Sequence, residues 1–379
     1  MAATVPTVPF NRPHRTGREA ARVGEALASD RWCGDGPFTA RASAMIAAAV
    51  GGGRVLLTTS CTHALELAAL LLDVGPADEV IVPAFTFVST AAAFALRGAR
   101  VVFADVDPRT LDLEPASVAR LVTPRTRAIV PVHYAGVACA HEQLAAAAPG
   151  VVIVEDNAHG LFGSWRGRPL GSLGALATQS FHETKNVSCG EGGALVVNDP
   201  ALVERAEILR EKGTNRARFF RGQVDKYTWV DVGSSYLPAD LLAAVLVAQL
   251  EAAERIQAAR HAVWARYHAE LATWAAHHGV QQPHLPDGAA HPAHLYWLRL
   301  RDLAARTRFI AHLAGRGVQA TFHYQPLHLS DVGRRAGGQP GDCPVTEQAA
   351  DTLVRLPLWT DLTADDVDRV VAAVTSFAP

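Results

Sequence analysis

The sequence has 379 residues, is 49% hydrophobic and carries a formal net charge of −2 at pH 7. This length and apolarity predict a globular protein of two or three domains with a large buried core. No long cluster of Lys and Arg occurs, which argues against nucleic acid, a membrane surface or another polyanion as a partner. Residues 1–18 lack the apolar stretch of a signal peptide, and no run of about 18 apolar residues follows. We therefore expect a cytoplasmic protein.

Five cysteines are scattered without Cys-x-x-Cys spacing, a pattern typical of reduced thiols rather than of a disulfide framework or a zinc site. His133, Cys139 and His141 lie close together in the sequence. We interpret them as packing residues because no fourth ligand is suggested, and we expect no metal.

The N-terminal part predicts helices over residues 16–30 and 39–50, followed by a strand over 54–59. The next residues, Ser60-Cys61-Thr62, begin an apolar helix. Free N–H groups and the positive end of the helix dipole make such a helix N-terminus a possible phosphate-binding site. Simple capping of the helix by Ser60 or Thr62 would explain the same residues.

Strands and helices then alternate along the chain. Apolar strands are expected at 79–82, 101–106, 128–133, 151–154, 175–181 and 194–197. Helical patterns are expected at 85–96, 114–123, 140–148 and 201–212. Alternation of this kind predicts βαβ units, and therefore an α/β fold with a mostly parallel sheet covered by helices on both faces.

The stretch 151–185 combines an acid at a strand end with a lysine. The apolar run at 151–154 ends at Glu155 and Asp156, and the following strand leads into Lys185. Ligands of open α/β sheets bind at the carboxyl ends of strands, which places Asp156 to meet one. An amine that can bind an aldehyde and a carboxylate that can keep a ring nitrogen protonated suit pyridoxal phosphate (PLP). A surface ion pair at two loop ends is the alternative.

The segment 212–236 mixes cations with aromatic residues, including Arg221, Lys226 and Tyr227. This composition suits an anionic ligand that contains a ring, and it equally suits an exposed, partly interfacial loop.

Helices dominate residues 239–278, and a proline- and histidine-rich turn region follows at 283–294. The last part predicts a compact α+β unit. Its strands are expected at 295–300 and 318–324, and its helices at 303–314, 345–354 and 363–376. We therefore predict a large domain over 1–250, which includes the N-terminal helical segment, and a small C-terminal domain over 251–379.

Seven motifs occur in this order: SCTHALELA, FTFVSTA, PVHYAG, VEDNAHG, SFHETKN, EGG and HYQPLH. Together they resemble the DegT-type sugar aminotransferases, a family of PLP-dependent enzymes of fold-type I, over nearly the whole chain. The run KGTNRARFFRGQVDKYTWVDVGSSYL resembles the branch of that family that contains dTDP-4-amino-4,6-dideoxygalactose transaminase.

The resemblance implies a role for each matching residue. Lys185 would hold PLP covalently and move protons, Asp156 would pair with the ring nitrogen, and His159 would lie near the ring. Phe87 would stack on the ring, although it could also be a core residue. The phosphate would be bound by Ser60, Cys61, Thr62 and Ser180, and by Ser235 of a neighbouring subunit, so that a homodimer with shared sites is expected.

The implied reaction transfers the amino group of L-glutamate, through the pyridoxamine phosphate (PMP) form of the cofactor, to C4 of a dTDP-linked 4-keto-6-deoxyhexose. Arg221, Lys226 and Tyr227 would meet the sugar nucleotide, with His323 and Tyr324 nearer the sugar. Transfer to C3 and a non-catalytic, PLP-binding regulatory protein are the alternatives. A lyase or desulfurase is disfavoured because no residue flanks Cys61 or Cys189 to activate a thiolate.

The sequence departs from the wider family at Cys61, Asn157, Ser235 and Leu237, where Gly, Ala, Asn and Arg are usual. The narrower branch shares the first, third and fourth of these residues, whereas Asn157 has no explanation in the sequence. Lys185 disfavours the related dehydratases, which carry His at this position.

Overall fold

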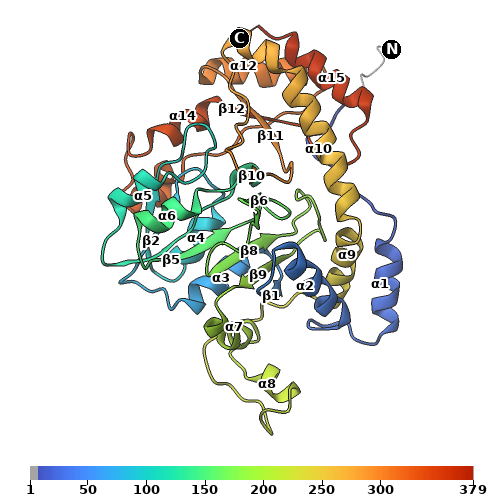
Figure 1. Ribbon diagram of the computed structural model, residues 1–379, viewed down its shortest axis with the longest axis vertical. Coiled ribbons are helices and arrows are strands. Elements are labelled where there is room, and N and C mark those ends of the chain that lie inside the picture. Colours follow the sequence, from blue (N-terminus) through green and yellow to red (C-terminus); the bar gives the residue numbers. More distant parts are fainter. Residues whose placement is uncertain (1–6, 379) are drawn as a thin grey trace.

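The computed structural model describes residues 7–378, and a central seven-stranded sheet dominates them (Figure 1). Its strands are β1 (Arg54–Thr58), β2 (Glu79–Pro83), β3 (Arg100–Ala104), β4 (Thr126–Ile129), β5 (Val152–Asp156), β8 (Leu176–Ser180) and β9 (Gly193–Val197). They lie in the order β1-β9-β8-β5-β4-β2-β3, and only β9 runs antiparallel to its neighbours. The predicted α/β class with a mostly parallel sheet is therefore confirmed.

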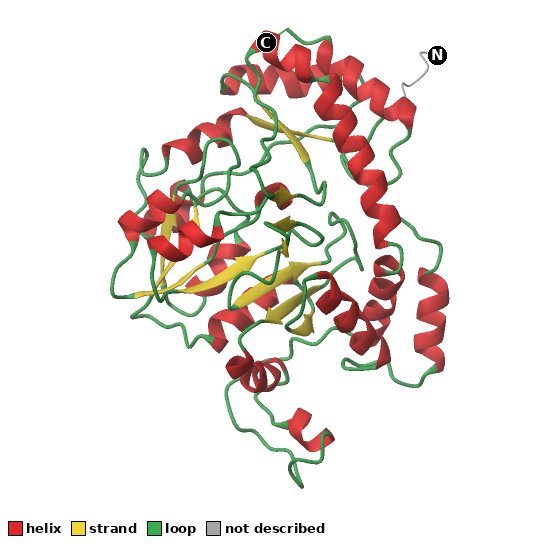
Figure 2. Ribbon diagram, in the orientation of Figure 1, coloured by secondary structure: helices red, strands yellow, loops and turns green. Residues whose placement is uncertain are grey.

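Helices cover both faces of this sheet (Figure 2). Those of the large part are α1 (Glu19–Ala28), α2 (Pro37–Ala49), α3 (Cys61–Leu71), α4 (Ser89–Ala95), α5 (Pro115–Leu121), α6 (His141–Ala147), α7 (Val203–Arg210), α8 (Arg216–Phe220) and α9 (Asp240–Leu250). Short 3-10 turns are η1 (Tyr134–Gly136) and η2 (Pro200–Leu202). Helices α3, α4 and α7 share one apolar cluster with the sheet. On the opposite face α2 and α9 pack near β1, whereas α5 and α6 pack near β3 and β4.

Burial on both faces explains the nearly unbroken apolar sequence of the strands. All five residues of β2 and of β9 are buried. Successive side chains point to opposite faces, so Val154 joins the cluster with α3 whereas Ile153 joins the cluster with α5 and α6. A strand that needs apolar residues on both sides reads as a continuous hydrophobic run.

The C-terminal part packs around a two-stranded sheet. Strand β11 (Tyr296–Arg299) pairs antiparallel with β12 (Leu353–Leu356). The helices here are α10 (Ala253–Glu270), α11 (Ala272–His278), α12 (Leu303–Ala314), α13 (Asp331–Arg335), α14 (Pro344–Thr352) and α15 (Ala364–Thr375), with the 3-10 turn η3 (Leu327–Leu329). Trp264, Tyr267 and Phe309 lie in its apolar core. Because α9 ends at Leu250 and α10 begins at Ala253, the predicted boundary falls between two helices, and the division into domains remains a prediction.

Several predicted elements were wrong. Residues 318–324 form no strand, because they make only isolated bridges to two different segments. Val318 bridges Val8, and Thr321 bridges Arg355. The helix predicted over 345–354 ends at Thr352, and the next four residues form β12 instead. A small sheet of β6 (Ser164–Trp165), β7 (Arg168–Pro169) and β10 (Ala289–Ala290) was missed, as was α8.

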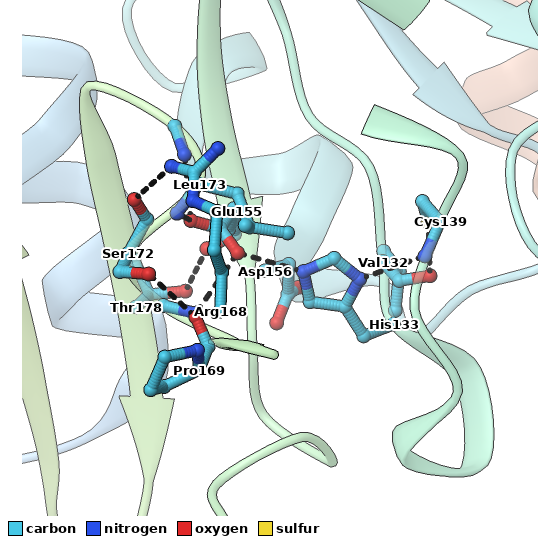
Figure 3. Close-up of polar contacts among 12 residues, drawn as sticks. Val132, His133, Cys139, Glu155, Asp156, Arg168, Pro169, Ser172, Leu173 and Thr178 are labelled. Carbon is cyan, nitrogen blue, oxygen red and sulfur yellow. Dashed lines mark hydrogen bonds and ion pairs between the residues drawn. The ribbon is translucent and has the colours of Figure 1, made fainter. Parts of the chain in front are cut away.

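Glu155 fixes the end of β5 (Figure 3). Its side chain points to the opposite face of the sheet from that of the next residue, Asp156. His133 Nε2 lies 2.9 Å from its carboxylate, and the N–H groups of Gly171, Leu173 and Gly174 donate to it at 2.7 to 2.9 Å. Because the Cys139 N–H donates to Nδ1 of His133, the other ring nitrogen carries the proton that Glu155 accepts.

These contacts also set the charge of Glu155. Burial would raise the pKa of Glu155, but the hydrogen bond from His133 and the backbone donors of Gly174 and Gly171 outweigh burial and lower this pKa from 4.5. The first of the two acids is therefore a structural residue and not part of the predicted crevice.

No helix among residues 7–378 combines the length and the apolarity that crossing a membrane requires.

We expect Glu155→Ala to lower the free energy of unfolding by roughly 3–5 kcal/mol, because it leaves the buried donors without their acceptor. Urea unfolding followed by circular dichroism measures this change. The exposed Glu254 provides the control, since Glu254→Ala should shift stability by no more than about 0.5 kcal/mol. In the wild type the Glu155 contribution should be present above pH 4.5 and fade as the pH falls towards its lower folded pKa. Equal stability of the two variants would contradict this role.

Candidate active site

A cavity of about 490 Å³ lies at the carboxyl ends of β5 and β8, between the large part and the C-terminal part. This volume is in the range of small-molecule sites. Ten residues predicted from the sequence line it: Ser60, Cys61, Thr62, Phe87, Asp156, His159, Ser180, Lys185, His323 and Tyr324. The fold thus brings together residues that are up to 264 positions apart in the chain, from Ser60 to Tyr324.

Asp156, the last residue of β5, is a buried carboxylate that points into this cavity. It accepts hydrogen bonds from the Thr90 hydroxyl at 2.7 Å and from the Ala158 N–H at 3.2 Å. Burial raises the pKa of Asp156, because low-dielectric surroundings disfavour the charged form. Within residues 7–378 no Lys, Arg or His lies within ion-pair distance of it. A cationic ring nitrogen in the cavity would provide the missing countercharge.

Lys185 enters the same cavity from the turn that follows β8, where its N–H donates to the carbonyl of His182 at 2.9 Å. Burial lowers the pKa of Lys185 from 10.5 to about 8, although the nearby Cys61 and Asp156 act in the opposite direction. At pH 7 about a tenth of the amine is therefore unprotonated, far more than at the ordinary pKa of 10.5, and this is the form that attacks a carbonyl.

The start of α3 forms one corner of the cavity. The Ser60 hydroxyl caps this helix by accepting the His63 N–H at 3.1 Å. The N–H groups of Cys61 and Thr62 belong to the first turn, where no intrahelical acceptor exists. Strand β9 reaches this corner through Gly193, at which a Cβ would lie 2.3 Å from the carbonyl carbon of Ser60. Only glycine allows this approach, and the resulting corner of N–H and hydroxyl groups suits a phosphate.

A group of rings forms the opposite wall. His159 stacks on His294 at 4.3 Å between centroids, and His323 stacks on Tyr324 at 3.8 Å. Burial holds the pKa of His159 well below its ordinary value, so its ring is neutral. Its Nδ1 is buried without a hydrogen-bond partner among the described residues, which leaves it available to a bound molecule. The sequence indicated His159 but not His294, which stood in a segment interpreted only as a turn.

The two aromatic residues before α4 have different environments. Phe85 is buried in the core, whereas Phe87 is 59% exposed and lines the cavity. An exposed ring at the cavity is free to stack on a planar ligand.

Four predicted residues lie outside this cavity in the single chain: Arg221, Lys226, Tyr227 and Ser235. The first three follow α8 in the segment that projects from the body below α7 (Figure 1), whereas Ser235 bridges Glu211, directly after the end of α7. Arg221 is paired with Glu207 at 2.8 Å, and Ser235 is exposed. A second subunit was expected to receive Ser235, so its role remains a prediction.

Asn157 and Arg355 were not understood from the sequence. Asn157 is buried, and no contact of its side chain with the described residues explains its presence. Arg355 of β12 lines the cavity. It belongs to no motif in the sequence, so the sequence did not indicate that it would lie there.

Cys61 lines the cavity and Cys189 does not, and neither is an activated nucleophile. Burial raises the pKa of Cys61, and it raises the pKa of Cys189 to about 12. Desulfurase-type chemistry requires a thiolate and therefore a lowered pKa, so these raised pKa values argue against it.

The chain is similar to characterised and solved proteins over almost its full length. The profile of the DegT/DnrJ/EryC1/StrS aminotransferase family matches residues 13–375. The spore coat polysaccharide biosynthesis protein SpsC of Bacillus subtilis is 32% identical over 377 residues, which cover 97% of this chain and 96% of SpsC.

Solved structures agree with this likeness. The aminotransferase TlmJ of Streptoalloteichus hindustanus is 34% identical, with a TM-score of 0.89 and coverage of 98% of each chain. Spr1654 of Streptococcus pneumoniae has the same TM-score at 26% identity, covers 98% of each chain in its PLP form, and was also solved in a PMP form. The aminotransferase fold of fold-type I, with its smaller C-terminal region, is therefore confirmed.

We expect borohydride reduction of the protein after incubation with PLP to fix the cofactor on Lys185. The sequence has only two other lysines, Lys212 and Lys226, so peptide mass spectrometry identifies the site directly. The rate of capture by the apoprotein should rise with pH through about 8, because the amine must lose its proton. Lys185→Arg should abolish labelling. Lys212→Arg, at an exposed residue paired with Glu211, should not. A label on Lys212 or Lys226 would contradict the assignment.

Proposed function

Because the chain belongs to the DegT/DnrJ/EryC1/StrS aminotransferase family, we propose that it transfers the amino group of L-glutamate to C4 of a dTDP-linked 4-keto-6-deoxyhexose. The observation that carries the proposal is the convergence of Asp156 and Lys185 in one cavity. Asp156 has no cation within ion-pair distance among the described residues, and Lys185 has a lowered pKa.

The residues of the cavity fit PLP. When bound, this cofactor supplies an aldehyde that carries the amino group and a ring that accepts electrons. Asp156 would meet the ring nitrogen, and the first turn of α3 with Ser180 would meet the phosphate. The orphaned Nδ1 of His159 gives a neutral partner for a further polar group of the ring.

Lys185 would have two tasks. Its amine holds the cofactor between turnovers, and when a substrate amine displaces it, it becomes a free base within the cavity. A base whose pKa lies near the working pH transfers protons efficiently in both directions, and its pKa of about 8 meets this condition. Thr90 keeps the Asp156 carboxylate aimed at the cavity, and Thr86 in turn contacts the Thr90 hydroxyl at 2.8 Å.

The choice of a sugar nucleotide rests on resemblance and composition. Residues 212–236 resemble the branch that contains dTDP-4-amino-4,6-dideoxygalactose transaminase, and they present exposed cations and rings, among them Arg221, Lys226 and Tyr227. SpsC is named for polysaccharide biosynthesis, in agreement with a sugar as acceptor.

The projecting segment also supports the proposed homodimer. Phe220 is 66% exposed, Trp229 is 76% exposed and Tyr227 is 52% exposed, so the segment presents large apolar side chains to its surroundings. Exposed apolar groups of this size are typical of an interface. Burial against a second subunit would carry Ser235 and the nearby cations towards the cavity of that subunit.

Incubation with L-glutamate and dTDP-4-keto-6-deoxyglucose should give one equivalent of 2-oxoglutarate and a dTDP-sugar that carries the new amine at C4. NMR of the purified product locates the amine and gives its configuration. Asp156→Asn should reduce turnover by about 10²-fold or more, because the ring would lose its charged partner. An amine at C3, or no transfer from glutamate, would contradict the proposal.

Sedimentation should show a homodimer that Trp229→Asp converts to monomers with weaker cofactor retention, because a charge cannot be buried in an apolar interface without cost. Leu303 is 45% exposed at the start of α12, far from α8 in Figure 1, so Leu303→Asp is the control and should remain dimeric. A Trp229→Asp variant that stays dimeric would place the interface elsewhere.

A further inference from the structure

Arg355 is a guanidinium at the cavity without an assigned partner. Its backbone is fixed in β12, where it pairs with Trp297 on one side and bridges Thr321 on the other. Its side chain lines the cavity, and the ring of Phe10 lies 4.6 Å from its guanidinium carbon. Within residues 7–378 no carboxylate lies within ion-pair distance of it.

The hydrogen bonds of Arg355 are incomplete as well. Nη2 donates to the Phe322 carbonyl at 3.3 Å, and Nε is buried without an acceptor among the described residues. A guanidinium has five N–H donors, and leaving them unpaired away from water is costly. Burial accordingly lowers the pKa of Arg355, although the group remains charged at neutral pH.

Another buried arginine shows how a structural guanidinium is satisfied in this protein. Arg260 also lacks a carboxylate partner within the described chain, but it donates to the carbonyls of Ala293, His294 and Leu358 at 2.5 to 3.2 Å. Its donors are directed at the backbone. Arg355 has one such carbonyl and faces the cavity, so its free donors are available to a ligand.

Among the described residues that line the cavity, Lys185 is the one lysine and Arg355 is the one arginine. Because Lys185 is committed to the cofactor and the phosphate has its own corner at α3, Arg355 remains for the charge of a substrate. The fork of a guanidinium matches the two oxygens of a carboxylate. The ring of a keto sugar has no charge, and the diphosphate of the sugar nucleotide is expected to meet Arg221 and Lys226, which lie outside the cavity of the single chain. An amino acid, in contrast, always carries a carboxylate beside its amine.

We propose that Arg355 binds a carboxylate of the amino-acid donor, and therefore acts in only one half of the transamination. This inference rests on the proposed function of the cavity as an aminotransferase site. In the other half, sugar hydroxyls take the place of the carboxylate and make weaker, neutral hydrogen bonds with the same group.

The N-terminal segment holds Arg355 in place. The Phe10 N–H donates to Gln319 Oε1 at 3.1 Å, and the Trp359 indole donates to the Pro9 carbonyl at 3.2 Å. Phe10 is thus fixed over the guanidinium and restricts its rotation, so that its donors stay directed at the cavity.

The test separates the two half-reactions of the holoenzyme. Titration of the PLP form with L-glutamate, followed by absorbance of the bound cofactor, gives the dissociation constant of the donor. We expect Arg355→Gln to raise it roughly 10- to 150-fold, the value of a charge-assisted hydrogen bond. Calorimetric binding of 2-oxoglutarate to the PMP form should weaken to a similar extent. Reaction of the PMP form with the keto sugar should change less than about threefold.

Two comparisons sharpen the result. Arg355→Lys keeps the charge but not the fork, and should recover part of the affinity. Arg308 is exposed on α12, and Arg308→Gln should behave as the wild type. L-Glutamine retains only one carboxylate: if its affinity also falls in Arg355→Gln, Arg355 binds the carboxylate on the α-carbon. A loss with L-glutamate alone assigns the second carboxylate.

Unchanged donor affinity in Arg355→Gln, or an equal loss in both halves, would overturn this inference while leaving the aminotransferase assignment intact. If the wild-type PLP form reacts with no amino acid, the proposed function itself fails. The two failures are therefore distinguishable in the same set of titrations.

Discussion

The site depends on a buried carboxylate that has no cation within ion-pair distance among residues 7–378. Asp156 is 5% exposed, and its two oxygens receive one hydroxyl and one N–H from the described chain. Neither donor carries a full charge, so burial raises the pKa of Asp156. In the proposed function a protonated ring nitrogen would complete this interaction, and its attraction to the carboxylate would contribute to the binding energy of the ring.

The neighbouring acid shows why this arrangement is possible. Glu155 precedes Asp156 on β5, and the alternation of a strand directs the two side chains to opposite faces. One carboxylate is saturated by His133 and three backbone donors, which lower its pKa and fix the end of the strand. The other remains poorly saturated and faces the cavity. One strand end therefore serves stability and ligand binding through adjacent residues.

The cavity has separate places for separate anions. The corner at α3 offers neutral N–H and hydroxyl donors, which suit a phosphate that stays bound through the reaction. Arg355 of β12 offers a full charge from the C-terminal part of the chain. Between them Lys185 has a pKa lowered to about 8 by burial. If both corners carried a cation, the phosphate and the carboxylate could each bind in either corner. The different chemistry of the two corners avoids this competition.

The sequence by itself determined the α/β class, because strands buried on both faces must be apolar throughout and helices must alternate with them. It also indicated Asp156, Lys185 and the start of α3, whose chemistry depends on local strand ends and a helix terminus. Only the tertiary structure decided the rest. The first two residues of β12 were predicted as the end of a helix because a four-residue strand has no pattern of its own without β11. Arg355 and His294 reach the cavity through contacts between segments far apart in the chain, and no local periodicity records such contacts.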